Sequence, residues 1–410
     1  MKKTEQMLRF FSLSNISHKS SLTITKKAVT LCWVNTNNSP FSMIIKHLSI
    51  INYKNIVQAE LAFSPKINCF IGNNGMGKTN LLDAVYYLSF CKSSTNAIDS
   101  QVVNHGADVC MLQGKYEFEN DTIEEIYCGI RRRQKKQFKR NKKDYDRISD
   151  HIGLIPLVMI SPADNELIVG SSDERRRFMD ITISQFDKAY LQALMRYNRA
   201  LQQRNILLKN DDHAIDLTLL ELWENQLIED GKIIQEKRCA FIENLTPVFA
   251  ALYERISQSA ERVSFEYVSQ LNDVDFRESL IANRKRDIVI GHTTVGVHRD
   301  ELEMLLNGHP MKKVGSQGQH KTFFVSLKLA QFHFLLKTGR TTPILLLDDI
   351  FDRLDAHRVK EIVSLVSEPE FGQIFISDTN RESLDSLILP LGNSAHIYSV
   401  VNGEITLTTV

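Results

Sequence analysis

The stretch GNNGMGKT, from Gly72 to Thr79, decides the fold. It follows the apolar run INCFI and precedes the run NLLDAVYYL, which predicts a buried strand, a glycine-rich turn and a helix in that order. Such a turn directs backbone N–H groups toward a phosphate at the N-terminus of the helix. The pattern therefore predicts a nucleotide phosphate loop, whose ligand-binding residues are Gly72, Asn73, Asn74, Gly75, Met76, Gly77, Lys78 and Thr79.

Side chains for the phosphates and for a metal ion are present as well. We expect Lys78 to supply a cation to the β- and γ-phosphates, and the hydroxyl of Thr79 to ligate Mg²⁺. After the apolar run ILLL, Asp348 and Asp349 would lie at the carboxyl edge of a buried strand. We predict that Asp348 binds Mg²⁺, directly or through water, and that Asp349 polarises the attacking water.

The composition is that of an ordinary globular protein. Of 410 residues, 43% are apolar and 24% are charged, and no apolar run approaches the roughly 18 residues of a membrane-spanning helix. The formal net charge is +1, so a polyanionic partner would have to bind a local basic patch. The six cysteines lie far apart without metal-ligand spacing, which favours reduced, buried thiols in a cytoplasmic protein with no membrane partner.

The N-terminal part of the chain changes character at Met43. Residues 1–42 are polar and aperiodic, and we interpret them as a disordered or mis-started extension. Residues 43–168 are mostly strand-like, and we expect them to form the first half of the nucleotide-binding head, with the phosphate loop. The alternating runs span residues 43–51, 57–63, 109–117 and 122–130.

Residues 169–287 follow a helical period. Ser171 and Glu174 predict a capping box at the start, and apolar residues then recur at helical spacing. The polar break KNDDHAID divides the pattern into two long amphipathic helices, which we expect to form an antiparallel arm. A helical subdomain folded onto the rest of the protein is the alternative, because an apolar stripe does not show what it packs against.

Strand character returns in residues 288–410. Hairpins are predicted at LEMLLNGHPMKKV and HIYSVVNGEITLTT, each turning at Asn-Gly. Between them, SQGQ starts a helix whose free N–H groups, serine and glycine make a second phosphate-binding device. Its residues are Ser316, Gln317, Gly318 and Gln319. Alone they indicate only an N-cap, but here a phosphate loop precedes them and LLLDD follows.

The phosphate loop and the strand that ends in Asp348 are too far apart in the sequence for one or two βα units. The helical residues must therefore be inserted into a single nucleotide-binding fold whose two halves meet in space. We predict an α/β protein: a P-loop head with an antiparallel β lobe and an inserted helical arm in the form of an α-helical hairpin.

The order of these motifs resembles that of the ABC-type ATPase heads of the SMC group. Such heads carry a Walker A loop, an arm, a signature, a Walker B strand and a D-loop. The corresponding motifs in this chain are GNNGMGKT, GSQGQ, LLLDD and DRLD, which ends in Asp355. The segments LSIINYKNI, VMISPADNELIVGSSDERRRFMD and VGVHRDEL, together with the short arm, are similar to the RecF family of bacterial recombination mediators, over residues 43–410.

This resemblance implies an ABC-type P-loop ATPase with ATP and Mg²⁺ as cofactors. In such heads the signature, with Asp355 of the D-loop, completes the ATP site of a second copy, so ATP would hold a homodimer together. The resemblance further implies closure on double-stranded DNA or on junctions of single and double strands, and help for RecO and RecR in loading RecA at gaps. Slow, DNA-stimulated ATP hydrolysis would reset the clamp.

Other functions of such a site stay open. An ATPase subunit of a membrane transport or chromosome-maintenance system would also dimerise on ATP. A metabolic phosphotransferase would act without DNA, and a nucleotide-gated scaffold would scarcely hydrolyse ATP. The general base is open as well, because Asp349 stands where glutamate is usual, and SDT, from Ser377 to Thr379, stands in place of the switch histidine.

A basic run, RRRQKKQFKRNKKDYDR, covers residues 131–147. Its cations and interleaved aromatic residues suit contact with a nucleic-acid backbone. The alternative is a solvated hairpin whose charged edge prevents aggregation. The predicted DNA-binding residues are Lys135, Lys136, Lys139, Arg140, Lys142 and Lys143.

Overall fold

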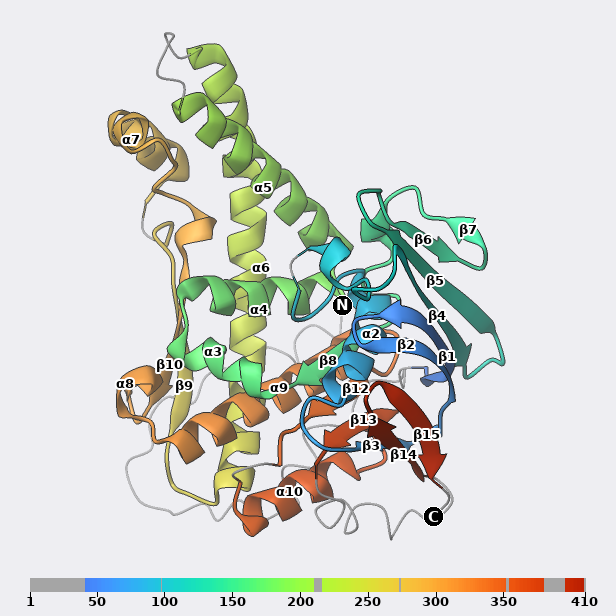
Figure 1. Ribbon diagram of the computed structural model, residues 1–410. Coiled ribbons are helices and arrows are strands. Elements are labelled where there is room, and N and C mark those ends of the chain that lie inside the picture. The colour runs from blue at the N-terminus through green and yellow to red at the C-terminus, as the bar shows by residue number, and fades with distance from the viewer. Residues whose placement is uncertain are drawn as a thin grey trace, which may run out of the picture. The chain divides into compact units, whose positions relative to one another are not determined.

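The predicted strand and helix around the phosphate loop are β3 (Ile67–Ile71) and α2 (Lys78–Phe90). They belong to a computed structural model that describes residues 41–96, 98–209, 216–272, 274–351, 354–379 and 395–408. Within it, Pro40–Val410 forms one compact unit, drawn in Figure 1. The extension predicted at residues 1–42 lies outside the described residues except for its last two positions.

A mostly parallel six-stranded sheet carries the phosphate loop. Its order is β15-β14-β3-β13-β12-β8, in which β15 alone of these strands runs antiparallel to its neighbour. The strands besides β3 are β8 (Leu157–Ile160), β12 (Ile344–Asp348), β13 (Ile374–Asp378), β14 (Ala395–Val401) and β15 (Glu404–Thr408). β12 is buried throughout, as expected for a strand covered on both faces. Because β13 lies between β3 and β12, this sheet joins the sequence halves that the helical insertion separates.

A second six-stranded sheet is antiparallel, with the order β2-β1-β4-β5-β6-β7. Its strands are β1 (Met43–Tyr53), β2 (Ile56–Ala62), β4 (Val109–Phe118), β5 (Ile123–Arg131), β6 (Gln137–Arg140) and β7 (Lys143–Asp144). Its first four strands match the predicted runs closely. α2 packs between the two sheets, because its apolar residues cluster with those of β1, β4 and β5 and also with Phe70 and Leu346 (Figure 1).

The helical insertion is an arm that is continuous with the head. Its long helices are α4 (Ser172–Ser184), α5 (Lys188–Leu208) and α6 (Leu217–Ser257). α5 and the N-terminal half of α6 form a hairpin that extends away from both sheets (Figure 1). The C-terminal half of α6 packs on α9 (Gln317–Thr338), where the rings of Phe249 and Phe323 lie 4.7 Å apart. Both predicted alternatives are therefore present in α6: its N-terminal half belongs to the projecting arm, and its C-terminal half packs on the rest of the protein.

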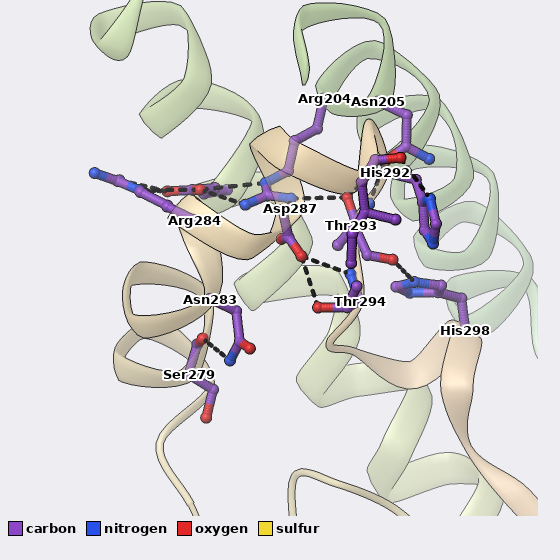
Figure 2. Close-up of polar contacts among 12 residues, drawn as sticks. Arg204, Asn205, Ser279, Asn283, Arg284, Asp287, His292, Thr293, Thr294 and His298 are labelled. Atoms are coloured by element: carbon purple, nitrogen blue, oxygen red, sulfur yellow. Dashed lines mark hydrogen bonds and ion pairs between the residues drawn. The ribbon is translucent and has the colours of Figure 1, made fainter. Parts of the chain in front are cut away.

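Helix α7 (Phe276–Ile290) is held to the arm by buried ionic contacts, shown in Figure 2. Arg204 of α5 donates to Glu224 of α6 at 3.0 Å and to Asp287 of α7 at 2.8 Å. All of these side chains are buried, so each charge depends on its partners. The boundary predicted between residues 287 and 288 falls inside α7, and the domain limits stay a prediction.

The capping box predicted at the start of α4 is wrong. Ser171 is the N-cap, but its side chain accepts no capping hydrogen bond from the described residues. The hydroxyl of the neighbouring Ser172 donates instead to Glu301 at 2.5 Å. Glu301 also pairs with Arg175 of α4 at 2.6 Å, so α4 is fixed by a contact with a distant strand.

The first predicted hairpin forms, but its second strand, β11, is only two residues long. Asn307 and Gly308 have φ of 51° and 78°, as an Asn-Gly hairpin turn requires. The segment MKKV after the turn is a short helix, α8. The remaining elements are β9 (Val263–Val268), β10 (Glu301–Leu306), β11 (His309–Pro310), α3 (Glu166–Val169), α8 (Met311–Val314) and α10 (Ala356–Val366). The C-terminal hairpin of β14 and β15 forms as predicted.

The described cysteines are free thiols, as predicted, and most of them are buried. Burial raises the pKa of the Cys69 and Cys91 thiols to about 12, which keeps them protonated and unreactive. The described ranges contain no helix that is both long and apolar enough to cross a membrane.

Buried histidines predict how the stability depends on pH. Burial lowers the pKa of His151, His298 and His333 from 6.5 to about 4. Between these values the unfolded chain binds protons that the folded chain does not. The free energy of unfolding should therefore fall as the pH drops from 6.5 toward 4, by up to roughly 1.4 kcal/mol per histidine and pH unit. Urea unfolding at several pH values measures this slope.

His151→Gln is the variant that isolates one contribution. Nδ1 of His151 accepts from Tyr145 at 2.8 Å and Nε2 donates to the carbonyl oxygen of Leu88 at 2.7 Å. A glutamine amide offers a donor and an acceptor without titrating in this range. The variant should lose one histidine's share of the pH dependence, and an unchanged slope would contradict the lowered pKa of His151.

Candidate nucleotide-binding site

The backbone of the phosphate loop requires its glycines. Gly75 and Gly77 have φ of 80° and 113°, which side chains disfavour. A Cβ on Gly72 would lie 2.2 Å from the carbonyl oxygen of Val400, on the neighbouring strand β14. The loop can therefore run this close to the sheet only with glycine where the motif has it.

Lys78, the first residue of α2, is turned back under the loop. Its ammonium donates to the carbonyl oxygens of Gly72 and Asn73 at 2.8 and 3.2 Å, and the residue is buried. The N–H groups at the start of α2 lie beside it, and the helix dipole there also favours an anion. A phosphate held by the loop would meet this ammonium.

Thr79 and Asp348 come together from the two halves of the chain. Oγ1 of Thr79 lies 2.9 and 3.0 Å from the carboxylate oxygens of Asp348. The hydroxyl of Ser377, at the end of β13, donates to the same carboxylate at 2.6 Å. Burial raises the pKa of the Asp348 carboxyl, and the hydrogen bonds from Ser377 and Thr79 oppose that rise. A nearby cation would stabilise the ionised form of this carboxylate.

The donor chemistry at this point fits Mg²⁺. This cation prefers oxygen ligands and is commonly bound by one or two protein groups, with water and substrate phosphates completing its shell. Thr79 and Asp348 would supply the protein oxygens. In the described part of the chain there is no cluster of three or more His, Cys, Asp or Glu that could hold a metal ion.

Asp349 adopts a left-handed backbone conformation, with φ of 45°. Its N–H donates to the hydroxyl and carbonyl oxygens of Ser377 at 3.1 and 3.2 Å. Ser377 therefore fixes both acidic residues, although the predicted site did not include it. The signal for it was present: Ser377 stands at the end of a buried strand, just as Asp348 does.

Two turns anchor the phosphate loop. In the turn between β1 and β2, the Asn55 amide donates to the carbonyl oxygen of Met76 at 3.2 Å and accepts from Asn80 at 2.7 Å. In the turn between β14 and β15, the Gly403 N–H donates to the same carbonyl oxygen at 2.9 Å. Sequence reasoning missed Asn55, because no motif links a hairpin turn to this loop.

The signature residues begin helix α9. The Ser316 N–H donates to Oε1 of Gln319 at 2.7 Å, and the Gln319 N–H donates to the Ser316 hydroxyl at 3.3 Å. The other end of the Gln319 amide donates to Glu261 at 2.7 Å. Arg358 of α10 lies over Gly318, because a Cβ there would come within 3.0 Å of its guanidinium.

Asp355 of the predicted D-loop is the N-cap of α10 and accepts from the Arg358 N–H at 2.9 Å. This hydrogen bond lowers the pKa of the Asp355 carboxyl. The first two D-loop residues, Asp352 and Arg353, lie outside the described residues. The signature is contacted by α10 and by the segment after α6, whereas the phosphate loop is contacted by the two hairpin turns. The fold thus brings Thr79 and Asp348 together, whereas the elements that hold the signature are different from those that hold the phosphate loop.

The basic run forms β6, β7 and the turns beside them, at one edge of the antiparallel sheet (Figure 1). Lys135, Lys142 and Lys143 are exposed. Arg140 is exposed too but pairs with Glu124 at 2.6 Å. Lys139 is partly buried and lies 3.5 Å from Asp144.

Lys136 is placed differently from the other predicted DNA contacts. Its ammonium donates to the carbonyl oxygen of Cys91, lies 3.0 Å from Asp99 and lies 5.3 Å from the ring centroid of Tyr87. The side chain keeps 15% of its exposure. An ammonium turned inward onto these partners is a structural cation, so we remove Lys136 from the predicted contacts.

Comparisons with known proteins show the family of this chain. A family model described as RecF/RecN/SMC N terminal domain matches residues 44–396. Proteins named DNA replication and repair protein RecF, from Parabacteroides distasonis and Bacteroides thetaiotaomicron, are 57% and 58% identical to this chain over 363 residues. The alignments cover 88% of this chain and 99% and 98% of those proteins. The chain belongs to the RecF family.

Solved structures confirm the predicted fold class. A structure described as the recombination mediator protein RecF-ATPrS in the RecFOR pathway has a TM-score of 0.80 at 27% identity, over 91% of this chain and 100% of that one. The Smc head domain of Pyrococcus furiosus has a TM-score of 0.54 at 17% identity, over 90% and 96% of the chains, and shows the fold alone. Both support an ABC-type head of the SMC group with an inserted helical arm.

The placement of Lys136 can be tested through stability. Lys136→Met leaves the Asp99 carboxylate and the Cys91 carbonyl without their cation, so we expect the free energy of unfolding to fall by about 1–3 kcal/mol. The matched Lys142→Met removes an exposed charge and should change it by less than about 0.5 kcal/mol. Urea unfolding of both variants measures this, and equal effects would contradict a structural role that is special to Lys136.

Proposed function

We propose that this chain is an ATP-dependent DNA-binding protein of recombinational repair and replication. Two copies would bind ATP between them and close on double-stranded DNA or on a junction of single and double strands. The names of the curated relatives support the setting, because they refer to DNA replication and repair. A structural relative described as RecF-ATP, 26% identical to this chain, supports the nucleotide.

One observation carries the nucleotide part of the proposal: Oγ1 of Thr79 lies 2.9 Å from the carboxylate of Asp348, across 269 positions of sequence. A loop with N–H groups for phosphates and an acidic strand end for a metal thereby converge at one point. The buried ammonium of Lys78 lies beside that point. This arrangement suits a nucleotide with β- and γ-phosphates bound together with Mg²⁺.

The signature supports the dimer. The Gly318 N–H and the Ser316 hydroxyl at the start of α9 would suit a phosphate. The signature is held by Glu261 and Arg358, and the phosphate loop by Asn55 and the turn of β14 and β15. The two devices are thus built on different elements. We infer that the signature, with Asp355, contacts the γ-phosphate of an ATP molecule bound by a second copy. ATP would then link the two copies of a two-fold symmetric dimer.

Hydrolysis would then separate the copies. Mg²⁺, held by Thr79 and Asp348, would neutralise charge on the β- and γ-phosphates. Asp349 follows directly after Asp348 and would orient the attacking water, and Ser377 would hold its backbone in position. We expect slow hydrolysis that DNA stimulates, so that the bound state persists long enough to act as a clamp.

The DNA-binding surface would include the exposed cations of the β6 and β7 edge. Lys135, Lys142 and Lys143 face solvent, with Arg140 and Lys139 beside them but paired to carboxylates. Backbone phosphates would bind such groups without regard to base sequence. By the family resemblance, the clamp would help RecO and RecR load RecA at gaps in the cytoplasm.

A mixing experiment tests the composite site. Lys78→Ala removes the phosphate cation and Ser316→Arg blocks the signature, so neither homodimer has an intact site. In a heterodimer both defects fall on one site and leave the other intact. We expect each variant alone to lose ATP-dependent dimerisation, and the mixture to recover about half of the wild-type rate of phosphate release per heterodimer.

Each variant should keep its thermal unfolding temperature, which excludes misfolding as the cause. Sedimentation with ATP, with ADP and without nucleotide separates dimerisation from hydrolysis. If the mixture releases no more phosphate than either variant alone, the two motifs do not meet across a dimer.

The salt dependence of DNA binding tests the basic edge. Lys142→Glu/Lys143→Glu should weaken binding to all duplex sequences alike and reduce the slope of log K against log salt by roughly 0.9 for each lost phosphate contact. Lys337→Glu/Lys360→Glu makes the same change of charge on exposed residues of α9 and α10, which are not part of this sheet. Titrations at several salt concentrations should leave that control with the wild-type slope. Equal slopes for both variants would return the basic run to a purely structural role.

A further inference from the structure

The signature is linked to the arm through a chain of hydrogen bonds. α6 runs from the arm into the head and ends at Gln258, which is in the left-handed conformation. Near this end, the hydroxyl of the fully buried Tyr253 donates to Oε2 of Glu261 at 2.8 Å. Oε1 of the same carboxylate accepts from Nε2 of Gln319 at 2.7 Å. Glu261 thus joins the last turns of the arm helix to the first turn of α9.

Gln319 is held at both ends of its amide. Its Oε1 accepts from the Ser316 N–H at 2.7 Å, and its Nε2 donates to Glu261. These partners fix the amide orientation, because a backbone N–H can only donate and a carboxylate can only accept. A capping box needs only the contact between Gln319 and Ser316. The bond to Glu261 is additional, and it holds the capping side chain to an element outside α9.

The position of this link matters because of the proposed function, on which the inference rests. In that proposal the Ser316 hydroxyl and the Gly318 N–H meet the γ-phosphate of a second copy. The positions of the Ser316 hydroxyl and the Gly318 N–H depend on the cap that Gln319 forms at the start of α9. The Gln319 side chain is in turn held by its hydrogen bond to Glu261. Burial opposes ionisation of the Glu261 carboxyl, but hydrogen bonds from Tyr253, Gln319 and Ser259 lower its pKa below the usual value. The positive charge of Arg358, which lies over Gly318, lowers this pKa further. The carboxylate is therefore kept ionised as a strong acceptor.

We propose that Glu261 is a positioning residue that sets the signature motif for the second copy's nucleotide, and that it couples the arm helix α6 to this interface through Tyr253. Among the described residues, the Glu261 carboxylate is bonded by Tyr253, Gln319 and Ser259 rather than by the phosphate loop or Asp348, so it acts on the signature through Gln319. A displacement of the end of α6 relative to α9 would change the Gln319 cap first.

Glu261→Ala tests the positioning. The variant should bind ATP to its own phosphate loop as the wild type does, while the Kd of the ATP-dependent dimer rises by about tenfold, as expected for the loss of one charge-assisted hydrogen bond. Glu261→Gln keeps one acceptor for Gln319 but loses the charge, so its dimer should be weaker than that of the wild type and stronger than that of Glu261→Ala. Glu266→Ala, an exposed carboxylate on the nearby strand β9, is the control and should leave both quantities unchanged. A fluorescent ATP analogue measures binding, and sedimentation measures the dimer.

Mixing shows whether the effect is exerted across the dimer. A heterodimer of Glu261→Ala and Lys78→Ala carries both defects in one site and has the other intact, so its phosphate release should exceed that of either variant alone. Tyr253→Phe removes only the bond from α6 and should weaken the dimer by about threefold. A wild-type dimer in Tyr253→Phe, beside a weak one in Glu261→Ala, would overturn the coupling to the arm.

Ser316→Arg separates the failure of this inference from failure of the proposed function. If Ser316→Arg abolishes the ATP-dependent dimer and Glu261→Ala leaves it unchanged, the positioning role is overturned and the composite site stands. If neither variant affects the dimer, the composite site itself is overturned. Reduced ATP binding by Glu261→Ala to its own loop would also overturn the inference, because a positioning role at the signature leaves that loop intact.

Discussion

The contact of Thr79 with Asp348 is the constraint on which the rest of the structure depends. It requires the carboxyl end of β12 to reach the first turn of α2, and the sheet meets this requirement by placing β13 between β3 and β12. The chain between the two sequence halves of the head, residues 169–287, must therefore leave the sheet and return to it. The insertion does so as a helical hairpin, whose returning helix, α6, packs its second half under α9. The same helix is thereby part of the arm and part of the head.

The long helix explains how distant parts of the chain can act together. At its arm end, Glu224 lies in a buried ionic network with Arg204 and Asp287, which fixes α7 against the hairpin (Figure 2). At its head end, Tyr253 reaches the signature through Glu261. A buried network with its charges paired resists bending, because any shift exposes an uncompensated charge. The network thus holds α5, α6 and α7 together at the arm end of α6.

The sequence predicted those parts of the site that a local pattern specifies. The phosphate loop depends on glycine at fixed spacing, and β12 on a run of apolar residues before an acidic pair, so both could be located. Asn55 and Glu261 could not, because each acts on a residue that is near only in the folded chain. Lys136 shows the same limit: Lys135 and Gln137 on either side of it are exposed, but its own partners Asp99 and Cys91 come from the segment after α2. Charge in a sequence does not show which side chains face water.

Backbone geometry accounts for the acidic residue that departs from the usual ABC pattern. Asp349 has φ of 45°, and its N–H is held by both oxygens of Ser377. Among residues with side chains, aspartate and asparagine enter this region at least cost, since their short polar groups bond locally. A glutamate would lose that advantage, so the constraint that Ser377 imposes favours the shorter acid. The shorter side chain in turn carries its carboxylate one methylene less far toward any attacking water, which is consistent with the slow hydrolysis proposed for a clamp.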